Sequence, residues 1–245
     1  MTSSAILIPA RYNSTRFPGK PLCKLGGKTM IERVYEKCKA TGYDTFVLTD
    51  DMRIGRIFGW EICWIDQKAF NSGTERCADA IGNDFFNSYD QFINVQGDMP
   101  DVTEEMIEKC IEQLSYNSAV STVYTDMPAC MQNDPNTVKM IRAYPSKALW
   151  FGRGNTGYGE WHLGVYGYKR HALVAYPSLE VTQEEKIEQL EQIRWLKSGW
   201  QIGCSRVDFD GVEINTPEDA DTWNVKEGIK NESWQDMGPN GIDPC

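Results

Sequence analysis

The loop after the first apolar run of the chain carries positive charges that could bind phosphate groups. Residues 5–8 are apolar and predict a strand, and Arg11, Arg16 and Lys20 follow them among small hydrogen-bonding side chains. In an α/β sheet, ligands bind at the carboxyl ends of the strands, so the loop is typical of an anion site. It is no Walker A loop, because Pro21 follows its Gly-Lys pair. A basic surface loop is the alternative.

Asp98 is the second group placed for chemistry. Residues 91–95 predict a strand that ends in a Gly97-Asp98 turn. Because the carboxyl ends of parallel strands meet at one edge of a sheet, we expect Asp98 at the same edge as the basic loop. A carboxylate there suits Mg²⁺, which binds through one or two carboxylates plus substrate phosphates. The alternative is an Asx-turn, in which the side chain bonds its own backbone.

A third stretch combines a helix start with an arginine. Ser72 and Glu75 have the spacing of a capping box, which predicts a helix from this point to about Ile81. The N–H groups at its start could receive an anion or a polar ligand. A plain capped helix with Arg76 on the surface is the alternative.

The order of the expected elements predicts an α/β fold. A helix over residues 28–41, closed by Gly42, and a strand over residues 45–49 complete a βαβ unit with the first strand. Capping residues also predict a helix from Thr216 and one continuous helix from Thr182 to Gly199. In the second, Ile187, Leu190, Ile193 and Leu196 are expected to face inward. Another helix is expected over residues 103–114, and further strands over residues 61–65, 119–125, 148–152, 161–168 and 201–208, with a turn and strand at 133–141.

Composition narrows the class of protein. The chain has 245 residues and a net charge of -10, which argues against non-specific binding of nucleic acid. No run is long and apolar enough to span a membrane, and the start of the chain lacks a signal peptide pattern. Its eight cysteines form no C-x-x-C pair and there are two histidines, so zinc is not expected. We expect a cytoplasmic protein with reduced thiols.

Seven stretches taken together resemble the CMP-Kdo synthetases, the cytidylyltransferases that activate 3-deoxy-D-manno-octulosonate (Kdo). In order they are IPARYNSTRFPGKPL, NSGTER, NVQGD, NDPNTVK, HLGVYGY, EKIEQLEQIRWL and INTPEDA, and the resemblance spans about residues 4–225. It implies an α/β fold with a Rossmann-like mixed, mostly parallel sheet flanked by helices, of the nucleotide-diphospho-sugar transferase type. A small dimerisation arm would pair two subunits as a homodimer. We expect one nucleotidyltransferase domain over residues 1–228, with the sugar-binding and dimerisation part at about 120–180, and a loose tail over 229–245.

The resemblance also implies a reaction, in which CTP and Kdo give CMP-Kdo and pyrophosphate. The anomeric hydroxyl of the sugar attacks the α-phosphate, a transfer in which catalysis is mostly positioning and charge stabilisation. The implied catalytic residues are Arg11, Lys20 and Asp98. The implied nucleotide-binding residues are Ala10, Arg11, Ser14, Lys20, Ser72 and Arg76. The implied sugar-binding residues are Gln96, Arg153, His162, Tyr166 and Gln192. Asp98 and Asn215 occupy the positions of the Mg²⁺ ligands.

The sequence departs from the family's pattern at three places. Asn215 stands where the family usually has a second metal-binding aspartate, and Met99 stands where a glutamate usually follows the Gly-Asp pair. The segment between Leu149 and His162 is short, and its usual Ser-Arg-x-x-Ile-Pro run is reduced to Gly152-Arg153. The sugar acid therefore stays open, with 8-amino-Kdo or a sialic, legionaminic or pseudaminic acid as alternatives to Kdo.

Two further alternatives lie outside this activity. A nucleotide-binding relative that has lost catalysis would explain the neutral Asn215. A glycosyltransferase of similar architecture usually carries an Asp-x-Asp metal motif, and Asp98-Met99-Pro100 lacks the second acid.

Overall fold

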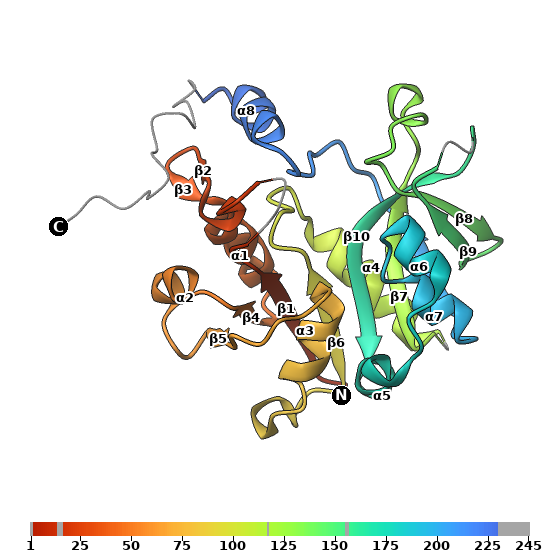
Figure 1. Ribbon diagram of the computed structural model, residues 1–245, viewed down its shortest axis with the longest axis horizontal. Coiled ribbons are helices and arrows are strands. Elements are labelled where there is room, and N and C mark those ends of the chain that lie inside the picture. The colour runs from red at the N-terminus through yellow and green to blue at the C-terminus, as the bar shows by residue number, and fades with distance from the viewer. Residues whose placement is uncertain (1, 14–16, 117, 155–156, 230–245) are drawn as a thin grey trace.

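A mixed sheet forms the centre of the molecule. The computed structural model describes residues 2–13, 17–116, 118–154 and 157–229 (Figure 1). Within them, one sheet has nine strands in the order β5-β4-β1-β6-β10-β7-β11-β9-β8. The strands are β1 (Ser4–Ala10), β4 (Asp44–Thr49), β5 (Cys63–Ile65), β6 (Gln91–Val95), β7 (Val120–Thr125), β8 (Lys139–Ala143), β9 (Lys147–Gly152), β10 (Glu160–Lys169) and β11 (Ile202–Arg206), and a separate hairpin pairs β2 (Lys24–Leu25) with β3 (Lys28–Thr29).

The strand directions divide the sheet into two parts. β5, β4, β1 and β6 are parallel, as the βαβ pattern predicts. β10 runs antiparallel to both β6 and β7, and β9 runs antiparallel to β11. The hairpin of β8 and β9 lies at the far edge, where β8 also pairs with β10 (Figure 1). The expected α/β class with a Rossmann-like mixed sheet is confirmed.

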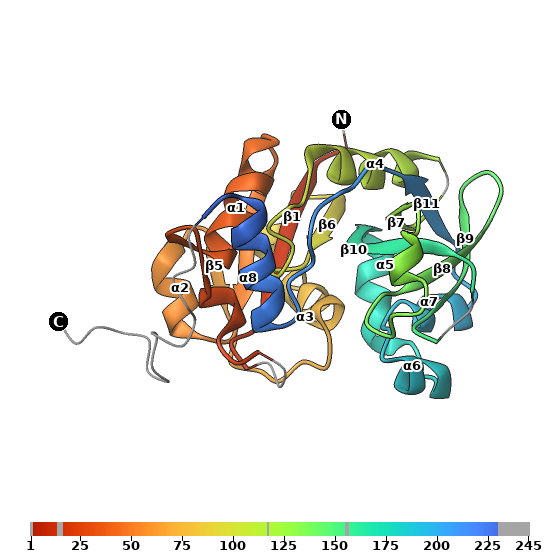
Figure 2. The ribbon, with the colours of Figure 1, turned by 90° about the horizontal axis from the view of Figure 1, so that it is seen from above.

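Helices cover both faces of the sheet (Figure 2). The helices are α1 (Met30–Ala40), α2 (Met52–Phe58), α3 (Gly73–Ala80), α4 (Glu104–Ser115), α5 (Arg170–Ala175), α6 (Gln183–Glu188), α7 (Ile193–Lys197) and α8 (Pro217–Lys226), with short 3₁₀ turns at Lys20–Leu22, Asp84–Phe86, Ala129–Met131 and Tyr176–Ser178. Along β1, Ile6 and Ile8 face α1 and α4, whereas Ala5 and Leu7 face α3. This alternation is the period of a strand buried on both sides. In the described residues, no helix is long and apolar enough to cross a bilayer.

One prediction for the helices is wrong. The stretch after Thr182 forms two short helices, α6 and α7, because Gln189 takes a left-handed conformation with φ of 54°. The amide of Leu190 bonds the carbonyl of Glu185, which ends α6. Ile187, expected to face inward, is 70% exposed, while Leu190 and Ile193 are buried. The sequence pattern also gave no sign of α2, which Asp51 caps by accepting from the amide of Arg53.

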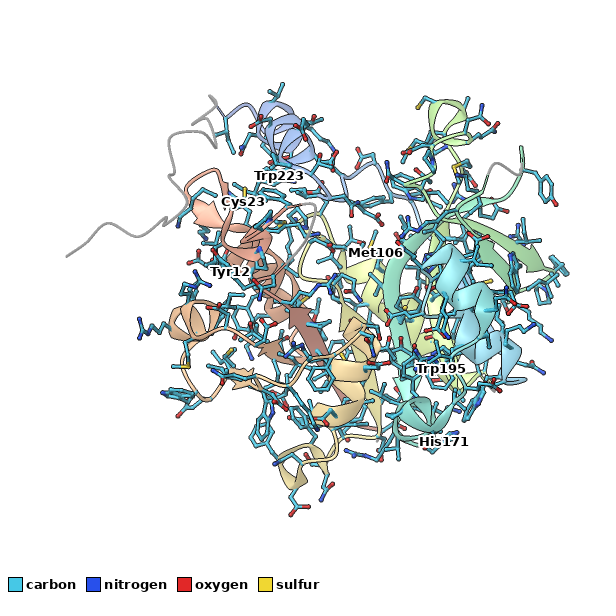
Figure 3. The ribbon with its side chains drawn as sticks, viewed as in Figure 1. Tyr12, Cys23, Met106, His171, Trp195 and Trp223 are labelled. Carbon is cyan, nitrogen blue, oxygen red and sulfur yellow. The ribbon has the colours of Figure 1, made fainter. Side chains whose placement is uncertain are left out.

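The last part of the chain returns over the sheet to the first loop. After β11 a long connection crosses to α8, which packs beside α1 and the β2–β3 hairpin (Figures 1 and 2). Trp223 of α8 lies against Cys23 (Figure 3) in a small core with Leu25 and Phe17. Ile229 packs on the same core, so the ordered chain extends at least one residue into the expected tail. Residues 230–245 lie outside the described part of the chain.

Candidate functional site

A cleft opens at the carboxyl ends of β1 and β6. It consists of two adjoining cavities with volumes of about 610 Å³ and 850 Å³. Both are lined by the residues Arg11, Ser72, Gln96, Asp98, Arg153 and Asn215. The strand ends therefore bring the basic loop, the start of α3 and Asp98 to one place, which is the arrangement that the α/β pattern predicts.

The basic loop is closed by its own backbone and by Asp50. The amide of Gly19 donates to the carbonyl of Tyr12 at 3.0 Å, and the amide of Tyr12 donates to Asp50 Oδ1 at 3.1 Å. Gly19 has φ of 72°, a conformation that glycine adopts without strain. The guanidinium of Arg53 stacks on the Tyr12 ring at 3.4 Å. Ser14, expected to bind nucleotide, lies outside the described residues.

Two expected nucleotide-binding residues lie at the start of this loop. Ala10 ends β1 and is buried beneath the cleft, where its side chain approaches within 3.2 Å of the position of a Cβ on Gly97. Arg11 is exposed and lines both cavities. A small residue at the strand end therefore lets the Gly97 backbone approach, while the arginine that follows reaches the ligand space.

Lys20 and Asp98 form an ion pair at the base of the cleft. Lys20 Nζ lies 2.5 Å from Asp98 Oδ2 and donates to the carbonyl of Ile214 at 3.1 Å. The amide of Ile214 donates to the carbonyl of Asp98 at 3.2 Å, so the connection before α8 is fastened directly to the Gly97-Asp98 turn. The spacing of 194 residues between Lys20 and Ile214 shows why the sequence could not place them together.

The residues around Asp98 offer the kind of ligand that Mg²⁺ prefers. The carboxylate of Asp98 and the amide of Asn215 line the same cavity and provide hard oxygen donors. The Lys20 ammonium already pairs with the Asp98 carboxylate and offsets its negative charge. Among the described residues, no three acidic, histidine or cysteine side chains converge as a complete metal site. The donor set therefore fits a cation that also takes oxygens from a bound phosphate.

Arg76 is a cleft residue and not a surface residue. It is 7% exposed, donates to the carbonyl of Asp66 at 3.1 Å and lies 3.5 Å from Asp50 Oδ2. Its guanidinium also stacks on the ring of Phe70. Burial lowers the pKa of Arg76 because it penalises the charged form. Asp50 thus connects Arg76 to the backbone of the basic loop at Tyr12.

The start of α3 is partly occupied by a carboxylate of the chain itself. Ser72 caps the helix by accepting from the amide of Glu75 at 3.1 Å, as predicted. The amide of Thr74 donates to Glu191 Oε2, also at 3.1 Å. Burial raises the pKa of Glu191. Glu191 was missed by sequence reasoning because it follows Gln189, whose turn ends α6 and directs the chain toward α3.

The five expected sugar-binding residues all line the larger cavity. His162 and Tyr166 come from β10, and His162 Nε2 lies 3.0 Å from Thr122 Oγ1. Burial and the neighbouring Arg153 lower the pKa of His162 to about 3, so the ring is neutral at physiological pH. Gln192 is 2% exposed, and its Nε2 has no hydrogen-bond partner within the described part of the chain. Gln96 Nε2 donates to Asn94 Oδ1 at 3.2 Å.

Arg153 is held by contacts that the sequence did not reveal. Its amide donates to Glu188 Oε2 and its Nη1 donates to the carbonyl of Asn136, both at 2.7 Å. The buried Lys139 donates from Nζ to the carbonyls of Arg153 and Asp134. A buried ammonium satisfied by carbonyls fixes the NDPNTVK turn against the short segment after β9.

Glu213 is a second acid that sequence reasoning missed. It lines the larger cavity with Asp98 and Asn215, and its carboxylate accepts from the amide of Gly164. Burial, together with the charge of Asp98, raises the pKa of Glu213 to about 7. The departure at Asn215 was visible in the sequence, but nothing there placed Glu213 beside Asp98.

Known proteins are similar to this chain in both sequence and fold. A family model for cytidylyltransferases matches residues 5–202. The chain is 35% identical over 254 residues to the 3-deoxy-manno-octulosonate cytidylyltransferase of Bacteroides thetaiotaomicron, covering 93% of this chain and 98% of that protein. It is 37% identical over 231 residues to the 8-amino-3,8-dideoxy-manno-octulosonate cytidylyltransferase of Shewanella halifaxensis, covering 87% of this chain and 94% of that protein.

Solved structures give the same result. The structure of a CMP:2-keto-3-deoxy-manno-octonic acid synthetase complexed with CTP matches with a TM-score of 0.84 at 30% identity, over 93% of this chain and 99% of that one. The 4-diphosphocytidyl-2C-methyl-D-erythritol synthase of Anaerococcus prevotii, at 13% identity and a TM-score of 0.62, shares the fold and covers 93% and 99% of the two chains. The protein is therefore an enzyme of the nucleotidyltransferase type. It belongs to the cytidylyltransferase family.

Proposed function

We propose that this enzyme transfers the cytidylyl group of CTP to the anomeric hydroxyl of a Kdo-type sugar acid and releases pyrophosphate. The observation that carries the proposal is that the two cavities adjoin. The cavity beside the basic loop and the cavity lined by the expected sugar-binding residues are both lined by Arg11, Asp98 and Arg153. Two relatives named for Kdo and for its 8-amino analogue support the class of acceptor.

The side chains divide the work along the cleft. Arg11 and Lys20 line the smaller cavity, which we assign to the triphosphate of CTP. An ammonium has three donors, and the bonds from Lys20 to Asp98 and to the carbonyl of Ile214 use two of them. The third can donate to a phosphate oxygen and stabilise the charge that develops there. Asp98 keeps Lys20 oriented for that contact.

The opposite end suits a sugar acid. The planar guanidinium of Arg153 can pair with a carboxylate in a two-point contact. The buried Nε2 of Gln192 is a donor for an oxygen of the acceptor. His162 is neutral and hydrogen-bonded to Thr122, so its role here is to shape and position the pocket.

Mg²⁺ is the cofactor that we propose for this reaction. Asp98 and Asn215 would hold it, and it would offset negative charge on the phosphates during transfer. The residues around it would align the acceptor hydroxyl and the leaving pyrophosphate on opposite sides of the α-phosphorus.

Pyrophosphate release tests the proposed activity. The assay combines the enzyme, CTP and Mg²⁺ with Kdo, 8-amino-Kdo and a set of nine-carbon 2-keto acids. We expect release with an eight-carbon acid and little with the larger acids. Binding of CTP with no release for any acceptor would overturn the proposal and favour a relative that has lost catalysis.

A further inference from the structure

The acidic side chains around the proposed cation site include one that has no assigned role. Asp98 is a carboxylate, but Asn215, its partner across the site, is neutral. Lys20 already shares the charge of Asp98. A divalent cation held with a nucleotide triphosphate usually binds one or two carboxylates of the protein. Three further carboxylates line the larger cavity with both residues. Glu185 accepts from Arg194 and Glu191 accepts from the amide of Thr74, so Glu213 is the one of the three without such a contact to α3 or α7.

The backbone of the connection before α8 directs Glu213 toward Asp98. Ile214 is fully buried in the core with Trp223, and its amide bonds the carbonyl of Asp98 at 3.2 Å. In an extended segment, residues two apart point to the same side. Since Ile214 points into the core, Glu213 and Asn215 both face the cleft, as their place in the cavity lining shows.

A further contact holds the carboxylate of Glu213 in place. It accepts from the amide of Gly164 on β10, so the side chain is fixed from the sheet as well as from its own segment. Asp98, Lys20 and Arg153 all act on its charge, which places Glu213 where the phosphate and sugar parts of the cleft meet. In the same cavity, the buried and unpartnered Nε2 of Gln192 indicates that a polar ligand completes the site (partners counted within the described residues).

We propose that Glu213 supplies the second carboxylate for the divalent cation, acting with Asp98 in place of a charge at residue 215. The inference rests on the proposed CTP-dependent activity. It assigns a metal-binding role to a residue outside the expected ligand pair of Asp98 and Asn215. The carboxylate of Glu213 would take up the cation without a change in the backbone, because the segment is already fastened to Asp98.

Binding of Mn²⁺ tests the assignment without relying on turnover. Electron paramagnetic resonance measures the Mn²⁺ that the enzyme and CTP bind together beyond the Mn²⁺ that CTP binds alone, in the absence of any sugar acid. We expect Glu213→Gln to weaken Mn²⁺ binding by about tenfold or more, the scale on which losing a group that supports a metal acts. Asp210→Asn is the matched control, because Asp210 lies in the same segment but is fully exposed. It should bind Mn²⁺ like the wild type.

A second variant separates a metal role from a structural one. Adding Asn215→Asp to Glu213→Gln returns one carboxylate to the site and should restore Mn²⁺ binding. Unchanged Mn²⁺ affinity in Glu213→Gln would overturn the inference, and so would a loss that Asn215→Asp leaves unrepaired. If the wild type with CTP binds no Mn²⁺ at all, the proposed function itself fails. That result is distinct from the two outcomes that overturn only the role of Glu213.

Discussion

The charged residues of the cleft differ in their contacts, and residue type alone does not predict these contacts. Lys20 is mostly buried, and it bridges the basic loop to Asp98 and to the connection before α8. Arg76 donates from Nη1 to the carbonyl of Asp66, and its Nη2 lies beside the Asp50 carboxylate, so it supports the loop that would hold the phosphates. Both residues line the smaller cavity, and Arg76 also supports the basic loop through Asp50.

Removing either member of the Lys20–Asp98 pair tests the centre of the proposed site. We expect Lys20→Ala and Asp98→Ala each to lower kcat by about 10²-fold or more, the scale of losing one stabiliser of transition-state charge. Steady-state pyrophosphate release measures the effect. Lys24→Ala, which changes an exposed lysine of β2, is the control. Near wild-type turnover in Asp98→Ala would show that the proposed cation does not bind there.

Asn215 can be examined from the opposite direction. Asn215→Asp adds a carboxylate beside Asp98, so we expect the enzyme to reach half of its maximal rate at a lower Mg²⁺ concentration. Titration of pyrophosphate release with Mg²⁺ measures this shift. An unchanged Mg²⁺ requirement would place the side chain of residue 215 away from the ion.

At the scale of elements, the turn between α6 and α7 does more for the site than either helix. Gln189 lines the cleft, and the reversal at its backbone brings Glu191 to the amide of Thr74 and buries Gln192. Side chains other than glycine adopt a left-handed conformation at a cost of roughly 1–2 kcal/mol. The contacts of the buried residues on both sides of the turn offset this cost.

Substitutions at Gln189 test this turn. Gln189→Gly should leave the free energy of unfolding nearly unchanged, since glycine suits φ of 54° but loses more entropy on folding. Gln189→Val should lower it by about 1–2 kcal/mol and should raise KM for the sugar acid more than KM for CTP. Urea unfolding and steady-state kinetics measure both. Equal stability of the two variants would contradict the role of the backbone conformation.

The same elements show how far the sequence predicts this fold. Local signals worked where a single residue determines the outcome: Ser72, Thr182 and Thr216 cap the helices that follow them. The turn at Gln189 could not be predicted, because the apolar spacing on either side fits one continuous helix and the competing contacts come from α3. Contacts between distant segments therefore determine the secondary structure here and override the local preference for one helix.

The candidate site also combines residues that the sequence pattern predicts with residues that only long-range contacts position. Asp98 and the basic loop were predicted to meet because both follow strands of one parallel sheet, and the structure places them 2.5 Å apart through Lys20. Glu191 accepts from the amide of Thr74, 117 residues earlier in the chain. The segment of Glu213 is fastened to the carbonyl of Asp98 by the amide of Ile214. No spacing within the sequence encodes such contacts.

At the scale of the whole molecule, the enzyme is acidic but its cleft is not. The net charge is -10, while Arg11, Lys20, Arg76 and Arg153 line one cavity. Concentrated positive charge in a concave site raises the local concentration of an anionic substrate. The surrounding negative charge favours solubility and disfavours nucleic acid, which agrees with small anions as the expected ligands.

The stability of the folded protein at low pH should depend on His162, which is buried against the larger cavity of the cleft. The pKa of His162 is lowered to about 3 by burial and by Arg153, whereas an unfolded histidine titrates near 6.5. The neutral ring therefore contributes stability above pH 6.5 that is lost as the pH falls toward 3. Over this range the unfolded chain binds one more proton, which is worth about 1.4 kcal/mol per pH unit.

The comparison of wild type with His162→Asn isolates this contribution. Urea unfolding between pH 7 and pH 4 should show that the stability of the wild type falls more steeply, by up to about 1.4 kcal/mol per pH unit relative to the variant. The difference between the two proteins should shrink as the pH is lowered. Parallel curves for the two proteins would show that His162 titrates in the folded state as it does in the unfolded chain.

The hairpin of β8 and β9 is where we propose that two copies of the chain associate. Tyr144 at its turn is 92% exposed and Leu149 in β9 is 48% exposed, and large exposed apolar groups on one projecting element are typical of an interface. We expect a homodimer at micromolar concentration by sedimentation equilibrium. Leu149→Glu should produce monomer, whereas Trp60→Glu, at an exposed site beside β5 on the opposite edge of the sheet, should stay dimeric. A wild-type monomer, or dissociation by Trp60→Glu alone, would show that this hairpin does not form the interface.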